Sequence, residues 1–174
     1  MRMVVIAALS VLSTLSGGTR AFAEEMPHIT GQNLADHQVE FPSVCAGVIC
    51  VIVVGFTHAS QSQAKAWTER ANAQLKTPHL AIYSMAVLED APRFVRGMVV
   101  HGMKSNTPSG ERARFVVVYQ GEKELKHITG FQKPEDAYIL LLDSKGDITW
   151  TTHGPVTDAA FSGLTRQISQ LKSE

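Results

Sequence analysis

Strand-type and helix-type patterns alternate along this 174-residue chain. Residues 48–56 (VICVIVVGF) form a continuous apolar, β-branched run, which is typical of a strand buried on both faces at the centre of a sheet. Shorter apolar runs predict four more strands, at 80–87, 115–119, 138–142 and 147–151. The turn sequence Asp143-Ser144-Lys145-Gly146 joins the last two runs and predicts a hairpin.

Apolar residues at helical spacing follow several of these strands. Ser60 and Gln63 match the S-x-x-Q capping box at the start of the first helix. Asp90 is placed to cap the second helix, with Pro92 in its first turn, and Thr157 is placed to cap the last. The order β-α-β-α-β-α-β-β-α predicts an α/β fold, with a mixed central sheet flanked by helices on both faces.

The first 23 residues have the pattern of a secretory signal peptide. Arg2 precedes an apolar run at 3–15, and Ala21-Phe22-Ala23 is a small-x-small cleavage site. The sequence therefore predicts a periplasmic or secreted protein that is cleaved near Glu24. An uncleaved N-terminal anchor is the alternative, although the run is shorter than the ~20 residues that span a bilayer.

The rest of the chain is predicted to form an N-terminal extension, 24–46, and one domain, 47–174. We expect one edge strand in the extension, near 38–41. Removal of the signal peptide leaves 14 basic against 16 acidic residues, a formal charge of −2. This balance gives no reason to expect a nucleic-acid partner, and no later segment is long and apolar enough to cross a membrane.

Three pieces of sequence, in this order, resemble the TlpA-like branch of the thioredoxin-like superfamily: 51–67, 114–131 and 138–150. The resemblance implies a thioredoxin-like fold, with the middle piece as a strand-helix insertion. A narrower similarity, to the mitochondrial ATP synthase assembly-factor family, starts from the helix PRFVRGMVVHGM and includes the hairpin that follows later in the chain. The residues that carry it are Arg93, Arg96, Asp143, Gly146, Ile148 and Trp150.

The sequence departs from the redox-active members at their active site. Those members carry C-x-x-C after the first buried strand, where the start of a helix lowers the pKa of the first thiol. Alignment on Phe56 puts Gln61 and Ala64 at the two cysteine positions, and alignment on Thr57 puts Ser60 at the cysteine of the peroxidase T-x-x-C motif. Redox members also have a cis-proline where this chain has Ala137, so we expect a trans bond here.

The loop that replaces the redox motif, Thr57, His58, Ser60 and Gln61, has three interpretations. It could be a catalytic loop, with His58 as general base and a hydroxyl as nucleophile. It could bind a small anion with its backbone amides. The third interpretation, a plain helix start, explains the same residue types by capping alone.

Cys45 and Cys50 are the two cysteines of the chain, with four residues between them rather than the two of a redox motif. A structural disulfide, a reactive pair, metal ligands and two independent thiols are all open. In a fully extended chain their Cα atoms would lie ~16 Å apart, too far for a bond. A turn at Gly47 would bring them together.

Basic residues concentrate between residues 93 and 114, where Arg93 and Arg96 are the first two. They could bind an acidic partner or a lipid headgroup, or they could be ordinary charged surface. The seven histidines show no metal-ligand spacing, so neither a metal nor a cofactor is predicted.

The pattern as a whole favours an exported, non-redox thioredoxin-like protein. It would act by binding another protein, as an accessory or assembly factor. One alternative is a thiol-redox or peroxide enzyme that uses Cys45 and Cys50. The other is a binder of a small anion or ligand at the loop 57–62.

Overall fold

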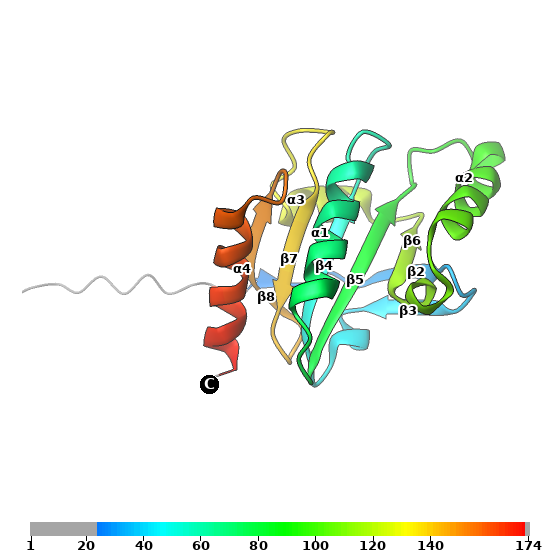
Figure 1. Ribbon diagram of the computed structural model, residues 1–174. Helices are drawn as coiled ribbons and strands as arrows, with labels where there is room; N and C mark the ends of the chain where they lie inside the picture. Colours follow the sequence, from blue (N-terminus) through cyan, green and yellow to red (C-terminus); the bar gives the residue numbers. More distant parts are fainter. Residues whose placement is uncertain (1–23, 173–174) are drawn as a thin grey trace, which may run out of the picture.

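The computed structural model describes residues 24–172, so the predicted signal peptide lies outside the described residues. These described residues fold into one eight-stranded sheet with four helices (Figure 1). The strands are β1 (Glu24–Glu25), β2 (Ile29–Asn33), β3 (Gln38–Phe41), β4 (Ile49–Gly55), β5 (Leu80–Val87), β6 (Phe115–Val118), β7 (Tyr138–Leu142) and β8 (Asp147–His153). The helices are α1 (Gln61–Gln74), α2 (Arg93–Asn106), α3 (Glu122–Ile128) and α4 (Asp158–Leu171), with 3₁₀ turns η1 (Ser43–Cys45) and η2 (Ser109–Arg114).

The sheet is mixed, with the strand order β1-β8-β7-β4-β5-β6-β2-β3. β4, β5 and β6 run parallel, while β7 pairs with β4 antiparallel and forms the predicted hairpin with β8. Parallel strands joined by helices, followed by a hairpin and a last helix, confirm the predicted α/β class.

β4 is the centre of the core, as its uninterrupted apolar run predicts. Its residues from Ile49 to Val54 are all buried. Val51 and Val53 pack with residues of α1 and α4, whereas Ile52 and Val54 face the opposite core, which includes Leu125 of α3. Figure 1 shows the same layering, with α1 and α4 in front of the sheet and α3 behind it.

The N-terminal residues add three strands to this sheet, where the sequence predicted one near 38–41. β2 lies between β3 and β6 and pairs antiparallel with both, and the two-residue β1 pairs with β8. Gly31 permits this packing, because a Cβ atom there would come within 2.5 Å of Val116 and 2.7 Å of the Val117 carbonyl. Such pairing depends on residues far away in the sequence, so the local pattern does not reveal it.

Two of the three predicted helix caps are wrong. Ser60 precedes α1 but makes no side-chain cap, and α2 is preceded by Pro92 with no side-chain cap from Asp90. The third is confirmed, since the Thr157 hydroxyl accepts a hydrogen bond from the Ala160 amide at the start of α4.

Candidate functional site

The loop after β4 is closed by its own hydroxyl groups. The Ser60 side chain is buried and donates a hydrogen bond to the Thr57 carbonyl at 2.9 Å. The Thr57 hydroxyl accepts from the Ser60 amide and donates to the Pro134 carbonyl, across to the loop before β7. Both hydroxyls thus hold the backbone in place, and the Ser60 hydroxyl is not presented as a nucleophile.

Gln63 explains why the predicted capping box does not form. Its Oε1 atom accepts a hydrogen bond from the Ala137 amide at 3.2 Å, 74 residues along the chain. Ala137 is fully buried directly before β7, and the one cis peptide bond among residues 24–172 is Phe41–Pro42. The bond before Ala137 is therefore trans, and its N–H, which a proline would lack, is bound by a residue of α1.

A carboxylate–imidazole pair lies near this loop. Asp136 is buried, and its Oδ2 atom lies 2.8 Å from Nδ1 of His153 at the end of β8. The His153 ring stacks on Tyr138, with centroids 5.4 Å apart, and the Tyr138 hydroxyl is fixed by the Lys133 backbone. Sequence reasoning missed this pair, because neither residue belongs to a motif. Among the residues from 24 to 172, Asp136 is the one side chain hydrogen-bonded to His153, so the pair lacks an attached nucleophile.

His58, the general base of the catalytic interpretation, is exposed in the same loop. The nearby carboxylate, that of Asp136, pairs with His153 and not with His58. The backbone amides of Thr57, Ser60 and Gln61 are bonded within the loop, to the Ser60 hydroxyl, the Thr57 hydroxyl and the His58 carbonyl. These bonds leave the three amides turned away from an external anion.

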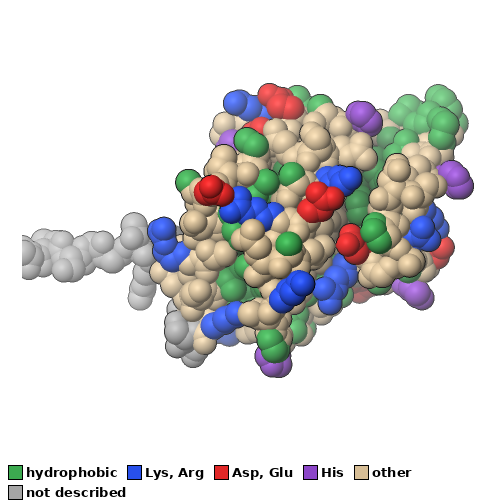
Figure 2. Space-filling model, viewed as in Figure 1, with side chains coloured by type: hydrophobic (Ala, Val, Ile, Leu, Met, Phe, Trp, Pro, Cys, Tyr) green, Lys and Arg blue, Asp and Glu red, His purple; other side chains and the backbone are tan. Residues whose placement is uncertain are grey.

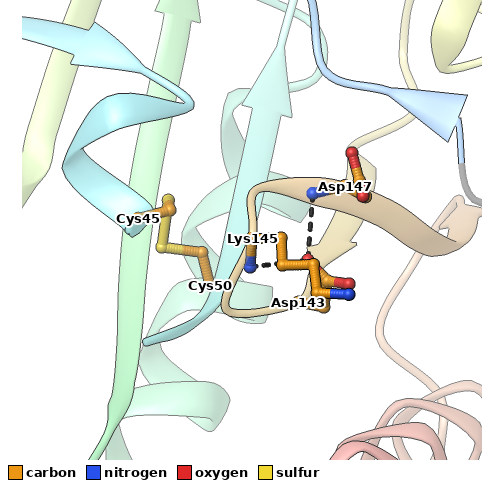
Figure 3. The surroundings of a disulfide bond; sticks show 5 residues. All are labelled: Cys45, Cys50, Asp143, Lys145 and Asp147. Carbon is orange, nitrogen blue, oxygen red and sulfur yellow. Dashed lines mark hydrogen bonds between the residues drawn. A yellow bond between two sulfur atoms is a disulfide. The ribbon is translucent and has the colours of Figure 1, made fainter. Parts of the chain in front are cut away.

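The two cysteines lie at the other end of β4 and form a disulfide (Figure 3). Cys45 comes from η1 and Cys50 from β4; their sulfurs are 2.15 Å apart, their Cα atoms 5.7 Å apart, and both residues are fully buried. Gly47, with φ of +80°, makes the turn that brings them together and donates to the Ser144 carbonyl. At ~3.3 Å per residue, the bond lies about 20 Å from the loop after β4.

The turn of the β7–β8 hairpin lies beside the disulfide, and Figure 3 shows how Asp143 organises it. Its carboxylate accepts from the amides of Lys145 and Asp147 at 2.9 and 3.0 Å. Asp143, one of the residues that carry the family resemblance, is therefore a turn former here.

The basic residues between 93 and 114 do not form one free patch. Arg96 donates to the carbonyls that precede α2, Lys104 pairs with Asp36, and Arg112 donates to the carbonyls of Lys104 and Thr107. Arg93 and Arg114 are exposed. Most of this charge fastens α2 and η2 to the rest of the chain, which adjacency in sequence cannot reveal.

Within residues 24–172, no three His, Cys, Asp or Glu side chains are grouped in a way that could hold a metal ion. Over the same residues, no helix is long and apolar enough to span a membrane.

The family model described as "ATP10 protein" matches residues 19–171. No curated protein matches the sequence. Solved structures match over most of the chain at low identity. The exposed lipoprotein thioredoxin Etrx1 of Streptococcus pneumoniae superposes with a TM-score of 0.58 at 11% identity, covering 85% of this chain and 100% of its own.

Two further structures agree with this match. BsSco, a member of the Sco family of cytochrome c oxidase assembly proteins, gives a TM-score of 0.57 at 14% identity, with 88% of this chain and 95% of its own covered. The thioredoxin domain of a thiol-disulfide oxidoreductase from Bacteroides vulgatus gives a TM-score of 0.56 at 17% sequence identity. The match covers 83% of this chain and 95% of that domain. At these identities the matches establish the thioredoxin-like fold.

Proposed function

Because the chain belongs to the ATP10 protein family, we propose that it is an exported assembly factor that binds another protein and carries out no thiol chemistry. The observation that carries the proposal is the thiol-free loop after β4. Its serine is buried and bonded to the backbone, and the residue in place of the proline is bonded to Gln63. The thioredoxin-like fold is intact, but the loop after β4, where redox-active members carry their two thiols, contains no cysteine.

The disulfide also argues against thiol exchange. Exchange requires a thiolate to reach a sulfur atom of the bond. Cys45 and Cys50 are both fully buried, at the end of β4 opposite to the usual active site. We therefore propose a structural role for the bond, which ties η1 to the central strand.

Insulin reduction tests the chemical part of the proposal. With dithiothreitol as reductant, the purified protein is expected to leave the rate of insulin precipitation at the level of dithiothreitol alone. A Gln61→Cys/Ala64→Cys variant is the matched comparison, because it places C-x-x-C at the aligned positions of the same scaffold. A rate well above background for the wild type, abolished in a Cys45→Ser/Cys50→Ser variant, would refute the proposal in favour of a redox enzyme.

Export is proposed from the signal-like pattern of residues 1–23. Cell fractionation and N-terminal sequencing test it directly. The expected result is protein outside the cytoplasm, with an N-terminus near Glu24. Full-length protein in the cytoplasmic fraction would contradict export.

A further inference from the structure

The outer face of α2 carries two large apolar side chains that no part of the described chain covers. None of the 14 residues of α2 is buried. The side chains of Phe94 and Met98, about one helical turn apart, are 86% and 71% exposed, and among residues 24–172 no other large hydrophobic side chain is exposed. Figure 2 shows hydrophobic side chains gathered at the α2 end of the molecule. Two large apolar side chains held next to each other in water are candidates for contact with another molecule.

A small number of polar contacts tie α2 to neighbouring segments. Arg96 donates to the carbonyls of Ala91 and Glu89 at 2.9 and 2.8 Å, and its guanidinium lies 5.2 Å from the centre of the Tyr119 ring. At the other end of α2, Arg112 donates to the Lys104 carbonyl at 2.7 Å. Phe94 and Met98 therefore project from a helix that is formed before binding, so the partner need not order it.

The shape and charge of the face indicate what covers it. Gly97 lies between Phe94 and Met98, and nothing lies within 4 Å of the place its Cβ would take. This notch lets the backbone of a partner helix approach closely. α2 has no acidic residue, and Arg93 is exposed next to Phe94, whereas Arg96 and Lys104 are bound to carbonyls and to Asp36. A carboxylate on the partner complements this charge.

We propose that α2 is the docking surface for the partner protein, and that the partner supplies an amphipathic helix whose apolar residues are bordered by Asp or Glu. Phe94 is the central anchor, Met98 extends the contact, and Arg93 pairs with a bordering carboxylate. The inference rests on the proposed function. A second copy of this chain does not fit, because its own α2 has no acidic residue to pair with Arg93 and would bring like charges together.

Two synthetic helical peptides test the proposal. They share one apolar face, which is bordered by Glu in one peptide and by Lys in the other, and binding is measured by calorimetric titration. The Glu peptide is expected to bind the wild type, and to bind Phe94→Ala about tenfold more weakly or worse. Arg93→Glu is expected to weaken the Glu peptide and to strengthen the Lys peptide. Lys65→Glu, an exposed charge reversal on α1, serves as the matched control and leaves both affinities unchanged.

Failure to bind the Glu peptide, equal binding of both peptides, or unchanged binding by Phe94→Ala overturns the proposal. Binding to phosphatidylglycerol vesicles with no peptide binding would assign the face to lipid instead. Because Phe94 is exposed, Phe94→Ala is expected to keep the wild-type unfolding midpoint, so lost binding cannot be blamed on misfolding.

Crosslinking in cells separates this inference from the proposed function. A photoreactive phenylalanine at position 94 is expected to crosslink to a protein that carries such an acidic amphipathic helix, whereas the same group at position 65 is not. If the same protein co-purifies equally with wild type and Phe94→Ala, the docking surface is wrong while the assembly role stands. If the wild type retains no protein, the proposed function itself fails.

Discussion

The hydrogen bond from the Ala137 amide to Gln63 joins the start of α1 to the start of β7, and its removal has a predictable cost. Gln63→Met keeps the length of the side chain but removes the acceptor. Ala137 is fully buried, so its N–H loses its acceptor without gaining free access to water. That loss costs about 1–3 kcal/mol. With about 2 kcal/mol lost, a domain of this size melts about 4–8 °C lower.

Urea unfolding measures this cost, with the fluorescence of Trp67 and Trp150 as the signal. Gln61→Met is the control, because it makes the same substitution at an exposed position in the first turn of α1. Gln63→Glu keeps an acceptor near the helix N-terminus and is expected to recover most of the loss. Should Gln63→Met prove no less stable than Gln61→Met, the contact has no energetic weight and the reasoning about Ala137 is refuted.

Two further predictions concern stability. Replacing Cys45 and Cys50 by Ala should lower the free energy of unfolding by about 2 kcal/mol, the low end of the usual range, because the bond closes only a short loop of the unfolded chain. Dithiothreitol in the denaturant should destabilise the wild type but not the variant, and equal sensitivity of the two would contradict this. Burial raises the pKa of Tyr83, against the opposing charge of Arg114, and the hydrogen bond that Lys126 donates to Glu122 raises the pKa of Lys126. The contributions of Tyr83 and Lys126 to the free energy of unfolding are therefore complete below about pH 10, and they are lost as the pH rises through the raised pKa values of the folded state. When unfolding is measured from pH 8 to 11, Tyr83→Phe should lose less stability at alkaline pH than the wild type. An identical dependence of stability on pH in the two proteins would contradict a raised pKa at Tyr83.

Features set by neighbouring residues were predictable from the sequence. The run at 48–56 forms the buried strand β4, because strands covered on both faces need no polar positions. The turn at Asp143 forms the predicted hairpin, and Thr157 caps α4 as expected. The hairpin turn and the helix cap depend on contacts between residues close in the sequence. The strand follows from the apolar character of its own residues.

Features set by distant partners were not predictable. Gln63 matched a capping pattern, but its side-chain oxygen accepts a hydrogen bond from the amide of Ala137, 74 positions away. Arg96 and Lys104 counted as part of one basic concentration, yet their side chains turn to carbonyls and to Asp36. The exposure of Phe94 was equally hidden, since an apolar stripe on a helix predicts a face toward the core.

Quantitative co-purification from the native cell envelope, with the wild type compared against Cys45→Ala/Cys50→Ala, separates partner binding from thiol chemistry. Both forms are expected to retain the same protein in equal amounts, and dithiothreitol is not expected to release it. Capture by the wild type alone, as a mixed disulfide that dithiothreitol releases, would contradict binding without thiol chemistry.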